Sequence, residues 1–170
     1  TFVGRALDSD RAGLTEVLRA AAAHRGAAIV EILQDCPIFN DGSFDVLRKE
    51  GAEERVIRVT PGEPITFGAN GEYCVVQSGF GLDVAKTADV SADEIVVHDP
   101  SLQDPAYSFA LSRLSDQNLE HTVMGIFRQV SRPTYNDQAR AQVAMARETM
   151  PHDTAALQSL LRGRDTWTVD

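Results

Sequence analysis

The residues most able to carry chemistry in this 170-residue sequence surround Cys36. The segment reads Gln34-Asp35-Cys36-Pro37-Ile38-Phe39-Asn40-Asp41-Gly42. A thiolate in such a polar stretch can act as a nucleophile, a metal ligand or an iron–sulfur ligand. A free cysteine is more commonly a small buried apolar residue, and single-residue evidence alone favours that interpretation.

Neither nucleophilic catalysis nor a self-contained metal site is strongly indicated. A cysteine nucleophile needs a base within reach, and the histidines are all remote from Cys36 in sequence: His24, His98, His121 and His152. A metal site would have to unite Cys36, Cys74 and histidines without C-x-x-C spacing. Cys74 lies in a strand pattern and is expected in the core. Two cysteines make no disulfide framework, so we expect free thiols and a reducing cytoplasm.

The elements that position Cys36 are predicted in the order strand, helix, strand. Residues 2–7 form an apolar strand pattern interrupted by Gly4, and the capping residues 8–10 predict a helix over 10–24. The apolar, β-branched run over 27–33 predicts a buried parallel strand. Ligands of such sheets collect at the carboxyl ends of the strands, which is where Cys36 follows.

The rest of the chain predicts a mixture of short strands and helices. We expect strands over 56–59, 65–67, 73–77, 94–97 and 123–130, loops at 79–82 and 99–100, and helices over 105–114, 136–149 and 153–162. Phe109, Leu111 and Leu114 are expected to face inward, and Trp167 to dock the tail. The predicted fold class is α/β, with a change of character near residues 50–55.

Composition and charge exclude several classes of protein. The sequence is 43% hydrophobic and 24% charged, as in globular chains, and no apolar run is long enough to span a membrane. The formal net charge is −9, and residues 51–120 hold most of it, with 4 basic and 12 acidic residues. Binding to nucleic acid requires clustered cations, so we expect no nucleic-acid partner and no membrane partner. The acidic stretch is most simply a solvated face.

The cysteine segment, beginning at Ile29-Val30-Glu31-Ile32-Leu33, resembles the β subunit of 2-oxoacid:ferredoxin oxidoreductases, most closely the 2-oxoglutarate type of actinobacteria. Its most specific part is the pattern Gln-x-Cys-x-x-Phe-Asn-Asp. The resemblance extends over essentially the whole chain, through the segments Thr1–Arg5, His24–Gly26, Gly62–Gly68, Val97–Asp99, Gly125–Arg128 and Arg132–Tyr135.

The resemblance implies cofactors as well as a fold. Subunits of this family bind thiamine diphosphate and Mg²⁺ and hold one [4Fe–4S] cluster, with Cys36 as the last of its four thiolate ligands. Asn40 and Asp41 would then form hydrogen bonds around the cluster as a second layer. Asp35 stands where the family pattern has Asn, and an ionised carboxylate close to the cluster should lower its reduction potential.

The resemblance also implies what this chain lacks. The family's Gly-Asp-Gly thiamine motif and the remaining cluster cysteines lie outside these residues. Residues 1–50 are thus expected to be the closing βαβ elements of a thiamine-diphosphate-binding module, and residues 51–170 a mixed α+β C-terminal extension. The chain opens with Thr1 rather than Met, so we expect a C-terminal half that retains no cofactor and is inactive alone.

The implied reaction of the whole enzyme is CoA-dependent oxidative decarboxylation of a 2-oxoacid, with electrons passing through the cluster to ferredoxin. The implied partners are an α subunit, ferredoxin, the 2-oxoacid and CoA. Two other hypotheses remain open at this point. In the first, the chain is a non-catalytic module that docks to a partner subunit. In the second, it is a free-standing enzyme that uses Cys36 as a nucleophile.

Overall fold

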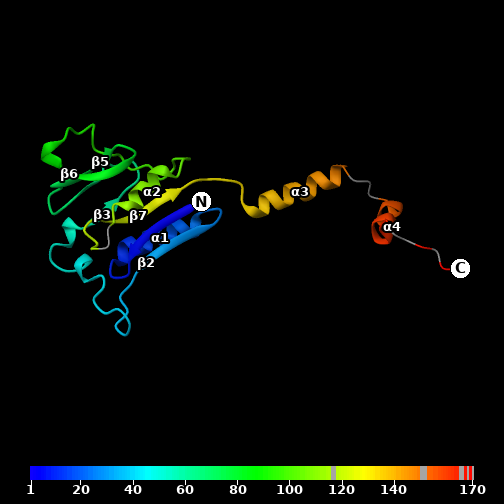
Figure 1. Cartoon of the computed structure of the whole chain (residues 1–170), viewed down its shortest axis with the longest axis horizontal. Coiled ribbons are helices and arrows are strands. Elements are labelled where there is room, and N and C mark those ends of the chain that lie inside the picture. The colour runs from blue at the N-terminus through cyan, green and yellow to red at the C-terminus, as the bar shows by residue number, and fades with distance from the viewer. Residues whose placement is uncertain (116–117, 150–152, 165–166, 168, 170) are drawn as a thin grey trace. The chain divides into compact units, whose positions relative to one another are not determined.

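The first three elements of the computed structural model have the predicted order: β1 (Phe2–Leu7), α1 (Arg11–Ala23) and β2 (Ala28–Leu33). β1 and β2 pair in parallel, and α1 packs on both strands, which makes a βαβ unit (Figure 1). The structure describes residues 1–115, 118–149, 153–164, 167 and 169. It divides into two units, Thr1–Arg132 and Pro133–Asp170.

Two further strands complete a mixed sheet with the order β2-β1-β7-β3. β7 (Thr122–Gln129) runs antiparallel to β1, and β3 (Val56–Val59) runs parallel to β7. The α/β fold class predicted from the sequence is therefore confirmed. The sheet draws strands from both sides of residues 50–55, while the division of the parent protein into a thiamine module and an extension stays a prediction.

A small antiparallel sheet and one helix pack against the β7 and β3 side of this mixed sheet. The small sheet consists of β4 (Thr66–Phe67), β5 (Tyr73–Ser78) and β6 (Gly81–Lys86), and the helix is α2 (Ala106–Arg113). Short 3₁₀ turns lie at Asp45–Leu47, Ala52–Glu54 and Thr87–Asp89. The main core cluster joins both sheets to α2 through Ile57, Val59, Ile65, Phe67, Val75, Leu111, Val123 and Phe127.

Two glycines allow close approach between neighbouring elements, Gly4 between β1 and α1 and Gly125 between β7 and β3. A Cβ atom on Gly4 would lie 2.7 Å from Cγ1 of Val17, a buried residue of α1. Gly125 of β7 has a φ of +124°, and a Cβ there would lie 2.8 Å from the carbonyl oxygen of Val59. Real Cβ atoms do not approach other atoms so closely, so glycine is required at both positions.

Several predictions about burial are wrong. β2 is parallel, as predicted, but it lies at the edge of the sheet and is largely exposed: Ile29 is 68% exposed and Ile32 is 44% exposed. In α2, Leu111 is fully buried while Phe109 is 65% exposed, because only one side of this short helix faces the core. The described residues include no helix long and apolar enough to cross a membrane.

Two other differences concern strands. Residues 94–97 form only isolated bridges, Pro64 with Val97 and Val76 with Ile95. Residues 79–82, expected as a loop, instead contain a tight turn, Gly79-Phe80, that connects β5 to β6. Gly79 adopts a φ of +57°, as a two-residue hairpin turn with glycine in its first position requires.

The second unit contains two helices, α3 (Tyr135–Thr149) and α4 (Thr154–Arg162), close to the predicted ranges. The side chain of Asp153 caps α4 by accepting a hydrogen bond from the backbone N–H of Ala156 at 2.7 Å. Gly163 follows the last turn with a positive φ. Trp167 is 84% exposed within this unit, and its docking of the tail stays a prediction.

Candidate functional site at the cysteine loop

The residues around Cys36 leave the sheet at the carboxyl ends of its two parallel strands. Leu7 at the end of β1 is paired with Leu33 at the end of β2, and the backbone N–H of Asp8 donates to the Leu33 carbonyl at 3.1 Å. We call residues 34–48, which follow, the cysteine loop. The sequence therefore predicted correctly that Cys36 lies at the carboxyl edge of a βαβ unit, where α/β proteins bind ligands.

One arginine fastens both ends of the cysteine loop to this edge. The guanidinium of Arg48 donates to Asp35 at 3.1 Å and to Asp8 at 2.6 Å. The second oxygen of Asp35 accepts the backbone N–H of Phe44 at 3.2 Å. All three charged side chains are at least two-thirds buried, which makes their hydrogen bonds stronger than those of a surface pair. Cys36 is thus adjacent to a fixed residue.

Apolar side chains close the base of the loop. Leu47 is almost completely buried and packs with Leu7 and Met124, while Leu33 and Phe44 pack around them. Phe44 precedes the 3₁₀ turn Asp45–Leu47, and Leu47 ends it. The end of the cysteine loop is therefore anchored in the core, and only its turn projects outward.

The backbone folds into a tight turn around the Cys36 sulfur. The Asn40 N–H donates to the Cys36 carbonyl at 2.8 Å. The backbone N–H groups of Phe39, Ile38 and Asn40 also interact with the sulfur and lower the pKa of the Cys36 thiol below its ordinary value, because they stabilise the thiolate. Cys36 is partly exposed, so this thiolate is accessible to a ligand.

The other residues of the turn point outward. Ile38 is 83% exposed and Phe39 is 89% exposed, which is unusual for two adjacent large apolar side chains. Asn40 and Asp41, expected to form hydrogen bonds around a cluster, are both exposed. Ser43 fixes the backbone here by donating from its hydroxyl to the Asn40 carbonyl at 2.7 Å. Asn40 and Asp41 lie on the same loop as Cys36, and their role in hydrogen bonding around a cluster stays a prediction.

From its position next to Cys36, Asp35 was expected to place an ionised carboxylate close to the cluster, but the structure gives this carboxylate other partners. Its carboxylate is turned toward Arg48 and the Phe44 N–H. A positive charge in contact with it offsets its negative field at the sulfur. Arg48 was not among the candidate residues predicted from the sequence, where its only signal is a basic residue shortly after two acidic residues that follow predicted strands, Asp8 and Asp35.

Cys74 and the described histidines have partners elsewhere. Cys74 is fully buried in β5, as predicted, and its thiol lies 3.8 Å from the Ala85 carbonyl. His24 lies 2.7 Å from the Thr1 hydroxyl, and His98 is buried between the Tyr107 hydroxyl and the Ile126 carbonyl. His121 contacts the ring of Phe67, and His152 lies outside the described residues. These contacts place none of the three near the cysteine loop as a base.

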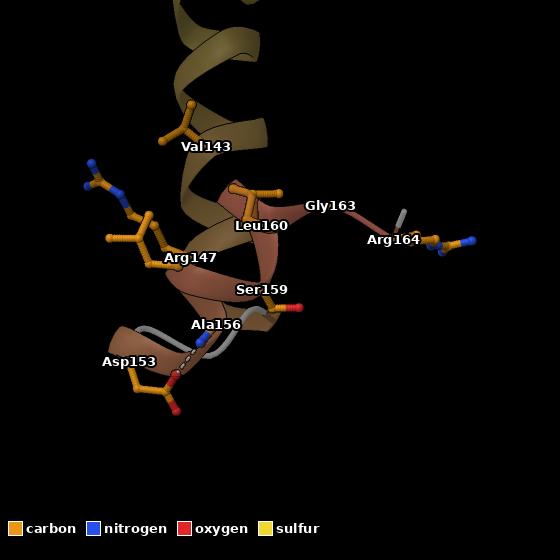
Figure 2. A pocket seen from close by; sticks show the side chains of 10 residues that line it. Val143, Arg147, Asp153, Ala156, Ser159, Leu160, Gly163 and Arg164 are labelled. Atoms are coloured by element: carbon orange, nitrogen blue, oxygen red, sulfur yellow. Dashed lines mark hydrogen bonds between the residues drawn. The ribbon is translucent and has the colours of Figure 1, made fainter. Parts of the chain in front are cut away.

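No metal-binding group is complete within the part of the chain that the structure describes. Those residues include no cluster of three or more His, Cys, Asp or Glu side chains able to hold a metal ion. A hollow of about 920 Å³ lies in the second unit. Figure 2 shows its lining residues, which come from α3, α4 and the residues that flank α4, and which include Val143 and Leu160. Its Asp153 carboxylate is used as the cap of α4, so the hollow offers little catalytic chemistry.

The proteins to which this chain is similar are oxidoreductase subunits. No family model matches the chain. The chain is 81% identical over all 170 residues to the 2-oxoglutarate oxidoreductase subunit KorB of Mycobacterium tuberculosis. It is 37% identical over 59 residues to a 2-oxoacid:ferredoxin oxidoreductase β subunit of Aeropyrum pernix, and 36% identical over 59 residues to that of Saccharolobus solfataricus.

The match covers only part of each relative. The chain spans 46% of the length of the mycobacterial subunit, and the shorter matches cover 35% of this chain and 18% of each archaeal subunit. The likeness to the mycobacterial subunit nevertheless includes every residue described above. The resemblance predicted from the cysteine segment is confirmed: the chain is similar over its whole length to a 2-oxoglutarate oxidoreductase subunit, and over 59 residues to β subunits of 2-oxoacid:ferredoxin oxidoreductases.

Proposed function

We propose that this chain is the C-terminal half of the β subunit of a 2-oxoacid:ferredoxin oxidoreductase, of the 2-oxoglutarate type. The observation that carries this proposal is the 81% identity over the full 170 residues, which includes the cysteine loop. In the proposed enzyme, a 2-oxoacid is decarboxylated oxidatively with CoA, and the electrons pass to ferredoxin. The other half of the subunit would supply thiamine diphosphate and Mg²⁺ binding, and an α subunit would complete the complex.

Within that enzyme, Cys36 provides one thiolate to a [4Fe–4S] cluster. Its environment fits this role, because backbone N–H groups lower its pKa and favour the ionised sulfur that binds iron. Such N–H donors also adjust the reduction potential of a bound cluster. Its partial exposure leaves room for a ligand, whereas the fully buried Cys74 has none.

The chain's own contribution is to hold that sulfur in one place. Arg48 fixes the residue before Cys36, and the N–H groups of the turn orient the sulfur itself. The bound cluster would supply a one-electron relay between the site of decarboxylation and ferredoxin. Asn40 and Asp41 are proposed to form hydrogen bonds around it, and the remaining three thiolates come from the rest of the subunit.

The remaining predictions follow from the same proposal. Residues 1–50 belong to the thiamine-diphosphate-binding module and residues 51–170 to an extension that contacts the α subunit. The enzyme works in the cytoplasm, where free thiols such as Cys36 and Cys74 persist. The chain alone, with none of the implied cofactors, is inactive.

The proposal is tested by turnover of the assembled enzyme. The α subunit and full-length β subunit are prepared anaerobically, and 2-oxoglutarate-dependent reduction of ferredoxin is measured with and without CoA. We expect the wild type to reduce ferredoxin in a CoA-dependent way and Cys36→Ser to be at least about a hundredfold slower, because changing even the residues around a metal's ligands costs about 10–100-fold in activity. Cys74→Ala is the matched control and should retain most activity. Wild-type turnover of Cys36→Ser, or no oxidation of any 2-oxoacid by the wild-type complex, would refute the proposal.

A further inference from the structure

β2 has the features of an interior strand but lies at an edge in this structure. It pairs in parallel with β1 alone, so one of its two backbone edges has no partner strand among the described residues. Its sequence, AIVEIL, is apolar except for Glu31, and Glu31 is tied to Arg5 at 2.6 Å. Isolated edge strands are normally protected by charges, prolines or bulges, and β2 has little of this protection.

The face of β1 and β2 opposite α1 is also open. It forms a groove of about 600 Å³ beside α2. Val3 of β1 and Ile29 of β2 line its floor, and Phe109 of α2 lines its wall. These side chains are 38%, 68% and 65% exposed. The Arg5–Glu31 pair is the main polar feature of the floor, and Arg5 lies over the ring of Phe127.

Parallel strands are nearly always covered on both faces. Within Thr1–Arg132 the described elements cover only the α1 face of β1 and β2, because α2 packs against β6 and β7 instead. This side of the sheet can therefore accept a further layer. Such a layer would consist of a strand beside β2 and a segment that fills the groove.

The length of the related subunit indicates where this layer comes from. The chain spans 46% of a relative with which it is 81% identical, so more than half of that polypeptide lies outside the matched region. A covalently linked segment docks without the translational entropy cost that a separate chain must overcome. A linked segment is therefore favoured over a separate protein as the occupant of the free edge of β2 and of the groove.

We propose that the free edge of β2 and the groove of Val3, Ile29 and Phe109 are the docking surface for the remaining half of the same β subunit, which adds a strand along β2 and covers the groove. This inference rests on the proposed function only in taking the chain as part of that subunit. The cysteine loop starts at the end of β2, so the docked half also lies next to Cys36. That half is the proposed source of the other cluster cysteines.

Hydrogen exchange of the full-length β subunit tests this proposal. Exchange is followed by mass spectrometry in the free β subunit at several concentrations and in the complex with the α subunit. We expect the backbone amides of Ala28–Leu33 to exchange as slowly as those of the interior strand β1 in the free subunit, independent of concentration. The turn at Gly79-Phe80 is the internal control and should exchange quickly in every sample, because Phe80 is fully exposed.

The other occupants give different results, each of which overturns the proposal. Protection of β2 that appears only after α is added assigns the surface to the α subunit. Protection that rises with concentration assigns it to a second β subunit. Rapid exchange in all samples means that nothing docks there. The iron content of the same samples is independent of this readout, so a failure of the proposed function is distinguishable from a failure of the docking proposal.

A pair of variants gives a second test. Ile29→Lys places a charge in the groove, and Phe80→Lys places one at an exposed turn. In the free full-length β subunit we expect Ile29→Lys to lower the melting temperature or prevent folding, whereas Phe80→Lys leaves it near that of the wild type. Equal melting temperatures for the two variants would overturn the proposal.

Discussion

At the scale of single residues, the site depends on how charge and backbone N–H groups surround one sulfur. The thiolate of Cys36 is favoured by the N–H groups of Phe39, Ile38 and Asn40. Asp35, which precedes Cys36 in the sequence, pairs with Arg48. Arg48 therefore serves the site indirectly, as a positioning residue that fixes the start of the cysteine loop.

Arg48→Gln should loosen the cysteine loop. The substitution removes charge-assisted hydrogen bonds to Asp8 and Asp35 and leaves two partly buried carboxylates without their cation. We expect the free energy of unfolding to fall by about 2 kcal/mol, measured by urea denaturation.

Lys49→Gln is the matched control for that variant. Lys49 pairs with Asp45 one turn away, but its side chain is 70% exposed. The loss there should be no more than about 0.5 kcal/mol. Equal losses for the two substitutions would mean that Arg48 is only a surface ion-pair residue.

At the scale of elements, close packing between α1 and β1 holds the edge from which the cysteine loop departs. Gly4 was noted in the sequence only as an interruption of an apolar strand, yet it allows Val17 of α1 to reach the sheet. Asp10, which caps the N-terminus of α1, also holds this helix in place. Its carboxylate accepts the Gly13 N–H and pairs with Arg58 of β3. Burial works against ionisation of Asp10, but these partners outweigh it and lower its pKa.

Gly4→Ala should destabilise the protein by about 1–3 kcal/mol, because the new methyl group overlaps Val17 and also approaches the Gly125 carbonyl at 3.3 Å. Gly81→Ala is the control: a Cβ there would lie 3.8 Å from the Ser78 carbonyl oxygen, an ordinary contact, and the φ of Gly81 is not in the positive range. Thermal denaturation of both variants measures the difference. A Gly4→Ala protein as stable as Gly81→Ala would show that α1 can shift without cost.

His98 should make stability depend on pH. Burial lowers the pKa of His98 in the folded protein, although the Ile126 carbonyl and the charge of Asp99 act in the opposite direction. The unfolded state therefore takes up more protons as the pH falls below the ordinary histidine value of about 6.5. The free energy of unfolding should be highest above that pH and should decrease as the pH falls toward the pKa of folded His98.

His98→Gln tests that origin by urea denaturation at pH 7.5 and pH 5.5. The variant should be less stable at the higher pH by about 1–3 kcal/mol, since hydrogen bonds to Tyr107 and Ile126 are weakened. Its loss of stability between the two pH values should be smaller than that of the wild type. An unchanged loss would assign the pH dependence to other groups.

The sequence predicted the local elements well and their surroundings less well. The βαβ unit, β3, β7 and the ranges of α3 and α4 follow from periodicity and capping, which are local signals. The exposure of β2 does not, because an apolar run cannot show whether a neighbouring strand is present. β6 was missed although Gly79-Phe80 is a recognisable two-residue turn. Arg48 was missed because its partner Asp8 is 40 positions away.

At the scale of the whole molecule, the unit Thr1–Arg132 has an α/β fold that presents the partly exposed Cys36 and the edge strand β2. Both features lie at or next to β2, since the cysteine loop is the direct continuation of that strand. In the proposed subunit, the half that docks along β2 also completes the ligand set around Cys36. The fold and the site are therefore expected to be completed by the same association.

The iron content of the full-length β subunit tests whether Cys36 binds the cluster. Full-length wild-type, Cys36→Ser and Cys74→Ala subunits are purified anaerobically, and iron, acid-labile sulfide and visible absorption are measured. We predict a [4Fe–4S] content that is unchanged in Cys74→Ala and lost or strongly diminished in Cys36→Ser. An intact cluster in Cys36→Ser, with the iron, sulfide and absorption of the wild type, would contradict the account.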